Sequence, residues 1–210
     1  MKKLLSAVVL GAAVLASSRT AGAQDSSGTA SKIGILPFAD ATASGNRAAG
    51  SDVARTMLAE VVHSTKLQPR LIVPDGSSRA GDVDPEKAIA LGRSEHLDLI
   101  FVGTVLDARS EQSSKSGRIP TLKGQSGSIT IHRVSATVTL QGELYDVASG
   151  RRLFSERVTG TNTNNAFGGT AYTTFGAWGN DTYASFLDSP MGKSLQTAIA
   201  DLTKKIVAAR

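Results

Sequence analysis

The sequence predicts an α/β (α+β) domain in which helices pack on a mixed β-sheet, in the order β-α-β-α-β, then a β-hairpin, then α. Three observations support this order. Short apolar runs alternate with stretches of helical periodicity in the first half of the chain. Residues 129–146 alternate apolar and polar side chains, as a strand with one solvated face does. A final stretch carries apolar residues on one helical face.

The first strand and the first helix follow from apolar content and capping residues. Residues 32–38 (KIGILPF) form a short buried strand that ends near Pro37, because proline cannot donate to a central ladder. Ser51 or Asp52 then caps a helix that runs to about Thr65. Its apolar side chains recur four residues apart and form one face.

A second strand, a second helix and a central strand come next. Residues 70–73 form a strand that a Pro-Asp-Gly turn signal ends. Asp84 caps the helix, Pro85 fits its first position, and the helix reaches about Ser94. Residues 98–107 (DLIFVGTVLD) are almost entirely apolar, which predicts a strand buried on both faces.

The last elements are a hairpin and a helix. Residues 129–146 and 151–159 form the hairpin, joined by an Ala-Ser-Gly turn. Asp188 or Ser189 caps the final helix, in which Pro190 takes the first position. An apolar stripe and a basic C-terminal end complete this helix.

The N-terminal residues have the pattern of a secretory signal peptide. Two lysines precede an apolar run over residues 4–15, and an A-x-A box follows at residues 21–23. The apolar run has about 12 residues, whereas a membrane span needs about 20. We therefore expect residues 1–23 to be removed by cleavage before Gln24, and the mature chain to work in the periplasm or cell envelope.

The mature chain is expected to be one domain. Residues 24–31 are small and polar and read as a disordered leader, and residues 32–210 are long enough for a single core. Two inserts are expected in this domain, at residues 109–128 and 160–187.

Charge and cysteine content restrict the function classes. The net charge of +5 falls to +2 once the three basic residues of the signal are removed, which gives little support to a nucleic-acid partner. The chain has no cysteine, so it has neither a disulfide nor the lipid-accepting cysteine that a lipoprotein anchor needs.

Four short segments carry a resemblance to a known family. They are Pro37-Phe38 after the first strand, Leu91-Gly92 with residues 98–105 (DLIFVGTV), residues 145–150 (YDVASG), and residues 189–193 (SPMGK). In this order the chain resembles the periplasmic domain of the CsgG-like family, which includes the curli secretion channel subunit, and is similar to the lipoprotein activators of penicillin-binding proteins. The likeness covers most of residues 32–210, and the missing cysteine is its main departure from the family.

The resemblance gives the two inserts a meaning. In the curli channel two segments leave the core and form transmembrane strands, and by position these are residues 109–128 and 160–187 here. Each is long enough for a two-strand hairpin, but the first is polar and basic where lipid-facing positions should be apolar. For the second, a pore hairpin, a partner-binding loop and a surface loop packed on the sheet all remain open.

The second insert supplies the candidate interface residues. Aromatic side chains stand out in this otherwise polar, glycine-rich stretch, and aromatic residues favour interfaces with proteins and with membranes. The candidates for a partner or membrane interface are Phe167, Tyr172, Phe175, Trp178, Tyr183 and Phe186.

No motif for catalysis or metal binding stands out. His63, His96 and His132 fall on different expected elements, and none is followed by a metal ligand three or four residues on. Glu60 precedes His63 by one helical turn, but two possible ligands alone do not make a metal site. Residues 192–194 (GKS) echo a phosphate-binding loop, but Leu187 stands where that loop needs glycine. We predict no catalytic residue, no metal and no cofactor.

The sequence therefore predicts a non-enzymatic envelope protein that acts as an assembly or interaction module near the outer membrane. Its expected partners are envelope proteins, with itself as a homo-oligomer among them; outer-membrane contact fits this role, whereas nucleic acid and a lipid anchor do not. The alternatives are a subunit of an oligomeric outer-membrane secretion pore of the curli type, and a hydrolase without a recognisable motif.

Overall fold

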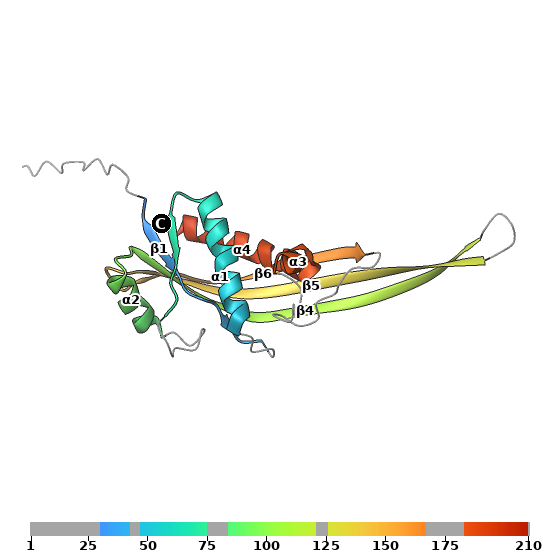
Figure 1. The fold of residues 1–210 in the computed structure, drawn as a ribbon, viewed down its shortest axis with the longest axis horizontal. Coiled ribbons are helices and arrows are strands. Elements are labelled where there is room, and N and C mark those ends of the chain that lie inside the picture. The colour runs from blue at the N-terminus through green and yellow to red at the C-terminus, as the bar shows by residue number, and fades with distance from the viewer. Residues whose placement is uncertain (1–29, 43–46, 75–83, 121–125, 167–182, 210) are drawn as a thin grey trace, which may run out of the picture.

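The computed structural model describes residues 30–42, 47–74, 84–120, 126–166 and 183–209 (Figure 1). The predicted signal peptide and almost all of the predicted leader lie outside these residues. Figure 1 shows a body of helices packed on a sheet, from which two long strands project together to one side.

The sheet is mixed and six-stranded, with the order β3-β1-β4-β5-β6 and with β2 paired to β4 off this path. β1, β3 and the start of β4 are parallel, whereas β4, β5 and β6 are antiparallel. This arrangement confirms the predicted fold class. The strands are β1 (Lys32–Ile35), β2 (Ala39–Asp40), β3 (Gln68–Leu71), β4 (Leu99–Pro120), β5 (Ser126–Asp146) and β6 (Arg152–Ala166). The helices are α1 (Arg47–Ser64), α2 (Pro85–Ser94), α3 (Tyr183–Asp188) and α4 (Pro190–Ala208).

Two cores lie on opposite faces of the sheet. Phe101 of β4 belongs to the larger core, which α1, α3 and α4 build with the sheet. Its neighbour Ile100 points the other way, into a smaller core with α2. No described helix covers the outer face of β5 and β6 beyond this smaller core, so polar side chains occupy it.

The capping residues predicted for two helices are confirmed. The side chain of Asp84 accepts a hydrogen bond from the N–H of Glu86 (3.1 Å), and α2 begins at Pro85. Ser189 accepts one from the N–H of Gly192 (3.1 Å) at the start of α4. Both caps satisfy N–H groups that the first turn of a helix leaves unpaired.

α1 begins at Arg47, before the predicted cap at Ser51 or Asp52. The added turn contains Gly50, a poor helix former, so tertiary contact rather than propensity holds it. The Gly50 carbonyl accepts a hydrogen bond from the N–H of Phe38 (3.0 Å). A Cβ atom at Gly50 would lie 2.0 Å from the Phe38 oxygen, so only glycine permits this approach.

β4, β5 and β6 are longer than predicted. β4 reaches Pro120 instead of residue 107, β5 begins at Ser126 instead of residue 129, and β6 reaches Ala166 instead of residue 159. In the β4 extension, the described side chains from Arg109 to Lys115 are polar on both faces, and so they lack the alternation from which strands are predicted. Residues 109–128, which the sequence marked as an insert, form a two-strand hairpin over their described part. We call residues 109–120 and 126–137 the arm.

Candidate interaction surfaces

Two of the six predicted interface aromatics fall within the described residues. Phe167, Tyr172, Phe175 and Trp178 lie outside them. Phe186 is 0% exposed and belongs to the larger core, so its place in an exposed interface is corrected. Phe186 lies on the side of α3 that packs into the larger core, and its polar sequence neighbours gave no sign of this tertiary contact.

Tyr183 is partly buried and joins α3 to α1. Its ring stacks on Phe186 with centroids 5.6 Å apart, and its hydroxyl is 2.6 Å from the hydroxyl of Thr56. Burial raises the pKa of Tyr183 to about 12, against the opposing effect of the hydrogen bond with Thr56. Tyr183 thus helps to fix α3, and its predicted role as an interface residue stays a prediction.

The sheet has one long open edge along β6 and another along β4 beyond β2. β6 pairs with β5 from Arg152 to Ala166 and has no described strand on its other side. Among the described strands, β2 covers β4 only at Thr104 and Val105, so no described strand pairs with the outer side of β4 from Asp107 to Pro120. Open edges present unpaired N–H and C=O groups that can pair with another strand.

The register identifies which residues offer backbone groups on the β6 edge. The carbonyl of Val105 accepts from the N–H of Ala41 (2.9 Å), on the side of β4 away from β5. Opposite residues of an antiparallel pair direct their backbone groups either both toward each other or both away from each other. Leu140, opposite Val105, therefore directs its backbone groups toward β6. Backbone groups of successive residues alternate sides, so those of Thr137, three residues before Leu140, point away from β6. The backbone groups of its partner Thr161 therefore point to the open edge.

The outer face of β5 and β6 is built from hydroxyl and amide side chains that bond across the strands. The hydroxyls of Thr139 and Thr159 are 3.1 Å apart, and those of Ser135 and Thr163 are 3.2 Å apart. Such cross-strand pairs stabilise a sheet without a covering layer. They explain how this face remains folded while it is solvated.

A small polar network ends this face near the body. Glu143 accepts hydrogen bonds from Ser155 (3.1 Å), from Arg152 (3.4 Å) and from the hydroxyl of Tyr145. Burial, together with the Glu143 carboxylate, raises the pKa of Tyr145 to about 12. The network holds the β5–β6 turn, where Gly150 adopts φ 71° as the predicted glycine-closed turn requires.

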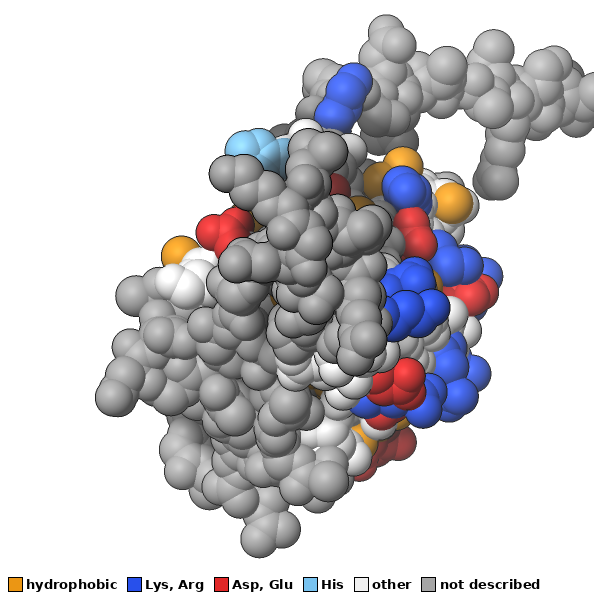
Figure 2. Space-filling view, turned by 90° about the vertical axis from the view of Figure 1, so that its right-hand side faces the viewer, with side chains coloured by type: hydrophobic (Ala, Val, Ile, Leu, Met, Phe, Trp, Pro, Cys, Tyr) orange, Lys and Arg blue, Asp and Glu red, His pale blue; other side chains and the backbone are white. Residues whose placement is uncertain are grey.

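Some charges near the sheet form pairs of opposite sign. Lys205 of α4 reaches Glu156 of β6 (3.2 Å), and Arg109 reaches Asp107 on β4 (3.2 Å). Figure 2 shows basic and acidic side chains intermixed along one side of the molecule. This pattern differs from the one-sign patch typical of nucleic-acid binding.

The described side chains of the arm on β4 are polar on both faces. Arg109, Glu111, Ser113 and Lys115 are exposed on one face of β4, and Gln112 and Ser114 are exposed on the other. Lipid-facing positions of a membrane-spanning strand are apolar. These residues therefore favour contact with water or with a polar partner.

The described residues also bear on metal binding and membrane spans. Within them, no group of three His, Cys, Asp or Glu side chains is placed to hold a metal ion. Of the helices in this part of the chain, none combines the length and the apolar character needed to cross a membrane.

No family model matches the chain, and no curated protein matches it. Several solved structures are similar to it at low identity. A PelC dodecamer from Paraburkholderia phytofirmans is 17% identical over 82% of this chain and 84% of that one, with a TM-score of 0.47. Protein CT253 from Chlamydia trachomatis is 14% identical over 84% and 95%, with a TM-score of 0.48. Lipoprotein GNA1162 from Neisseria meningitidis is 12% identical over 85% and 99%, with a TM-score of 0.42. These likenesses concern the fold alone, and the finer resemblance to the CsgG-like family stays a prediction.

Proposed function

We propose that this chain is a non-enzymatic cell-envelope protein that acts as an assembly module, and that the open edges of β4 and β6 are its binding surfaces. The observation that carries the proposal is the pair of long unpaired edges. The predicted signal peptide supports a place in the envelope. The absence of a catalytic motif from the sequence supports a role in binding.

A second copy of the chain is the partner that these edges fit best. β4 and β6 run in the same direction, because each is antiparallel to β5. A rotated copy therefore brings its β4 beside β6 as a parallel strand, which continues the sheet. β6 alone offers 15 residues, or about 50 Å of edge. A contact between two different edges is heterologous, so repeating it gives a closed ring or an open filament.

The edge contact can be tested with matched proline variants of the mature chain. Thr161→Pro removes an N–H from the open edge and leaves the β5–β6 ladder intact, whereas Asn162→Pro removes an N–H that faces β5. Thr161→Ala is the control for the lost side chain. We expect light scattering to show an assembly for the wild type and for Thr161→Ala, and a monomer with native circular dichroism for Thr161→Pro.

Two results would contradict the edge contact: a monomeric wild type at all concentrations, or an assembly of unchanged mass in Thr161→Pro. PelC, which shares the fold, occurs as a dodecamer, so the experiment should be able to distinguish a ring of that size from a dimer. Asn162→Pro is expected to lose thermal stability, which separates loss of the fold from loss of the contact.

A second candidate function is a subunit of a secretion pore. It is favoured by the hairpin at residues 109–128, which projects from the body as the CsgG-like resemblance implies (Figure 1). Its polar exposed side chains argue for the assembly module instead. Cell fractionation separates the two: retention in the outer membrane through a high-salt wash supports the pore, and release by osmotic shock supports the module.

A further inference from the structure

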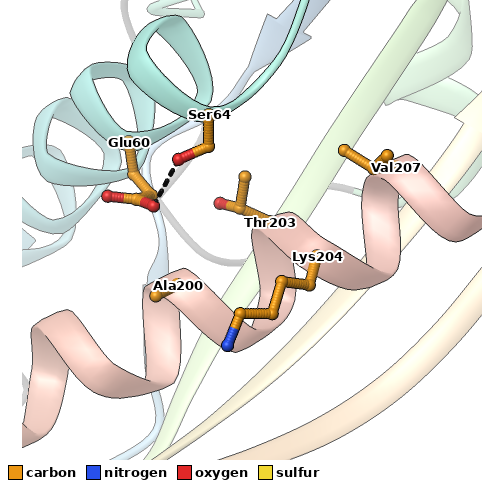
Figure 3. A pocket seen from close by; sticks show the side chains of 6 residues that line it. All are labelled: Glu60, Ser64, Ala200, Thr203, Lys204 and Val207. Carbon is orange, nitrogen blue, oxygen red and sulfur yellow. Dashed lines mark hydrogen bonds between the residues drawn. The ribbon is translucent and has the colours of Figure 1, made fainter.

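A groove runs along the seam between α1 and α4, on the helical side of the protein and apart from the sheet edges. It contains two adjoining hollows of about 290 and 230 Å³. Glu60 of α1 lines both, so the hollows meet at its side chain. The larger hollow is lined by Glu60, Ser64, Ala200, Thr203, Lys204 and Val207 (Figure 3).

The groove presents a carboxylate without a cationic partner. The hydroxyl of Ser64 donates to Glu60 (2.6 Å), and within the described residues Glu60 forms no ion pair. Lys204, on the opposite rim, is held by Asp201 at 3.0 Å. α1 and α4 both end beside the larger hollow, at Ser64 and just after Val207, and a helix C-terminus carries partial negative charge. The site therefore favours a cation.

The walls on either side of Glu60 are largely apolar. Val207 is 51% exposed at one end of the groove, and Ile199 lines the hollow at the other end. Thr203 forms part of the floor of the larger hollow, where its buried hydroxyl has no hydrogen-bond partner among the residues that the structure describes. Figure 3 shows Thr203 and Ala200 directed from α4 toward Glu60 and Ser64 of α1.

The spacing of the hollows matches one face of a helix. Along α4 the two are centred about six residues apart, which corresponds to about 9 Å at 1.5 Å per residue. Side chains at positions i and i+7 of a partner helix are about 10 Å apart on one face. A residue at i+3 or i+4 of that helix would then face Glu60.

We propose that the α1–α4 groove binds an amphipathic helix of another protein, which places apolar side chains at i and i+7 in the two hollows and a lysine or arginine between them on Glu60. This site is distinct from the edges of β4 and β6 and does not depend on assembly. A half-buried acid between two hollows with apolar side chains specifies both the shape and the charge of its partner.

The test uses the mature chain and two synthetic amphipathic peptides. Each peptide has leucine at two positions seven apart; one has lysine midway and the other has glutamate there. Binding is measured by fluorescence anisotropy of the labelled peptides, at low salt, with wild type, Glu60→Gln and Glu86→Gln. Glu86 is an exposed acid on α2, which makes it a matched control for the lost charge.

We expect the lysine peptide to bind wild type about ten-fold more tightly than the glutamate peptide, since attraction is replaced by repulsion across one rim contact. Glu60→Gln should reduce this ratio to about two-fold, and Glu86→Gln should leave it unchanged. The proposal is overturned if neither peptide binds wild type, or if Glu60→Gln and Glu86→Gln give the same ratio. Native circular dichroism of both variants shows that they are folded. The peptides should leave the assembly mass of the wild type unchanged, which separates these outcomes from those of the edge experiment.

Discussion

Gly160 of β6 lies in close contact with the backbone of α4, and its substitution tests how the body is packed. A Cβ atom at Gly160 would lie 1.9 Å from the carbonyl oxygen of Ser194 and 2.8 Å from the N of Ala198. Both atoms are backbone of α4, so no side chain can rotate away. Gly160→Ala must therefore shift the helix by at least about 1 Å, which also stretches the 2.9 Å hydrogen bond from the Ser194 hydroxyl to the Ala136 carbonyl.

The magnitude follows from the cost of overpacking a core. Such insertions cost about 1–3 kcal/mol, and the rigid backbone contact places Gly160→Ala near 3 kcal/mol. For a domain of this size that loss lowers Tm by about 6–12 °C. Gly142→Ala meets the flexible end of Leu202 at 2.8 Å and an edge of Phe101, so its cost should be smaller.

Urea denaturation followed by circular dichroism measures both variants, with the exposed Thr161→Ala as the control. We expect the free energy of unfolding to fall in the order Thr161→Ala, Gly142→Ala, Gly160→Ala. A loss below 1 kcal/mol for Gly160→Ala would refute the close contact between α4 and β6.

Three further predictions concern stability. Thr203→Val removes a buried hydroxyl without a partner and should raise the free energy of unfolding by about 1 kcal/mol in urea denaturation; a decrease would mean that the hydroxyl is bonded. Folding raises the pKa of Tyr145 from 10.0 to about 12, so the stability that this proton contributes is complete below pH 10 and is lost as the pH rises to 12. Because solvent screens the partly exposed hydroxyl, this loss should stay below about 2.7 kcal/mol, and it should be absent from Tyr145→Phe when unfolding is measured across that range; equal pH profiles would contradict it. His96 adopts φ 53° just after α2, where glycine is favoured, so His96→Gly should raise the calorimetric Tm by an amount equivalent to about 1 kcal/mol, and a lower Tm would show that the His96 side chain stabilises the turn.

Local chemistry allowed much of the body to be predicted from the sequence. Asp84 with Pro85, and Ser189 with Pro190, mark helix starts because capping depends on neighbouring residues alone. The apolar run at residues 98–107 and the alternation at residues 129–146 correctly indicated two strands, since burial there follows a simple period. The structure adds that these strands are neighbours in the sheet.

The full length of the arm and the groove could not be predicted from the local sequence. The β4 strand of the arm carries polar side chains on both faces from Arg109 to Lys115, so no hydrophobic period marks it. Cross-strand pairs such as Thr139 with Thr159 appear only once the register is known. Phe186 was assigned to a surface from its polar neighbours, whereas its position on α3 buries it. The groove joins Glu60 to Thr203, residues far apart in the chain that tertiary packing brings together.

Disulfide trapping in cells tests the proposed edge contact most directly, because the natural chain has no cysteine to give background crosslinks. Thr161→Cys on β6 is combined in turn with cysteine at Arg109, Glu111 or Ser113 of β4, which share its face of the sheet. Cα atoms of adjacent strands are about 5 Å apart, within the range that a disulfide bridges. If β4 of one copy pairs with β6 of the next, at least one combination gives a ladder of covalent multimers on non-reducing gels, and Thr161→Cys alone gives none. Exported protein that remains monomeric in all three combinations would contradict it.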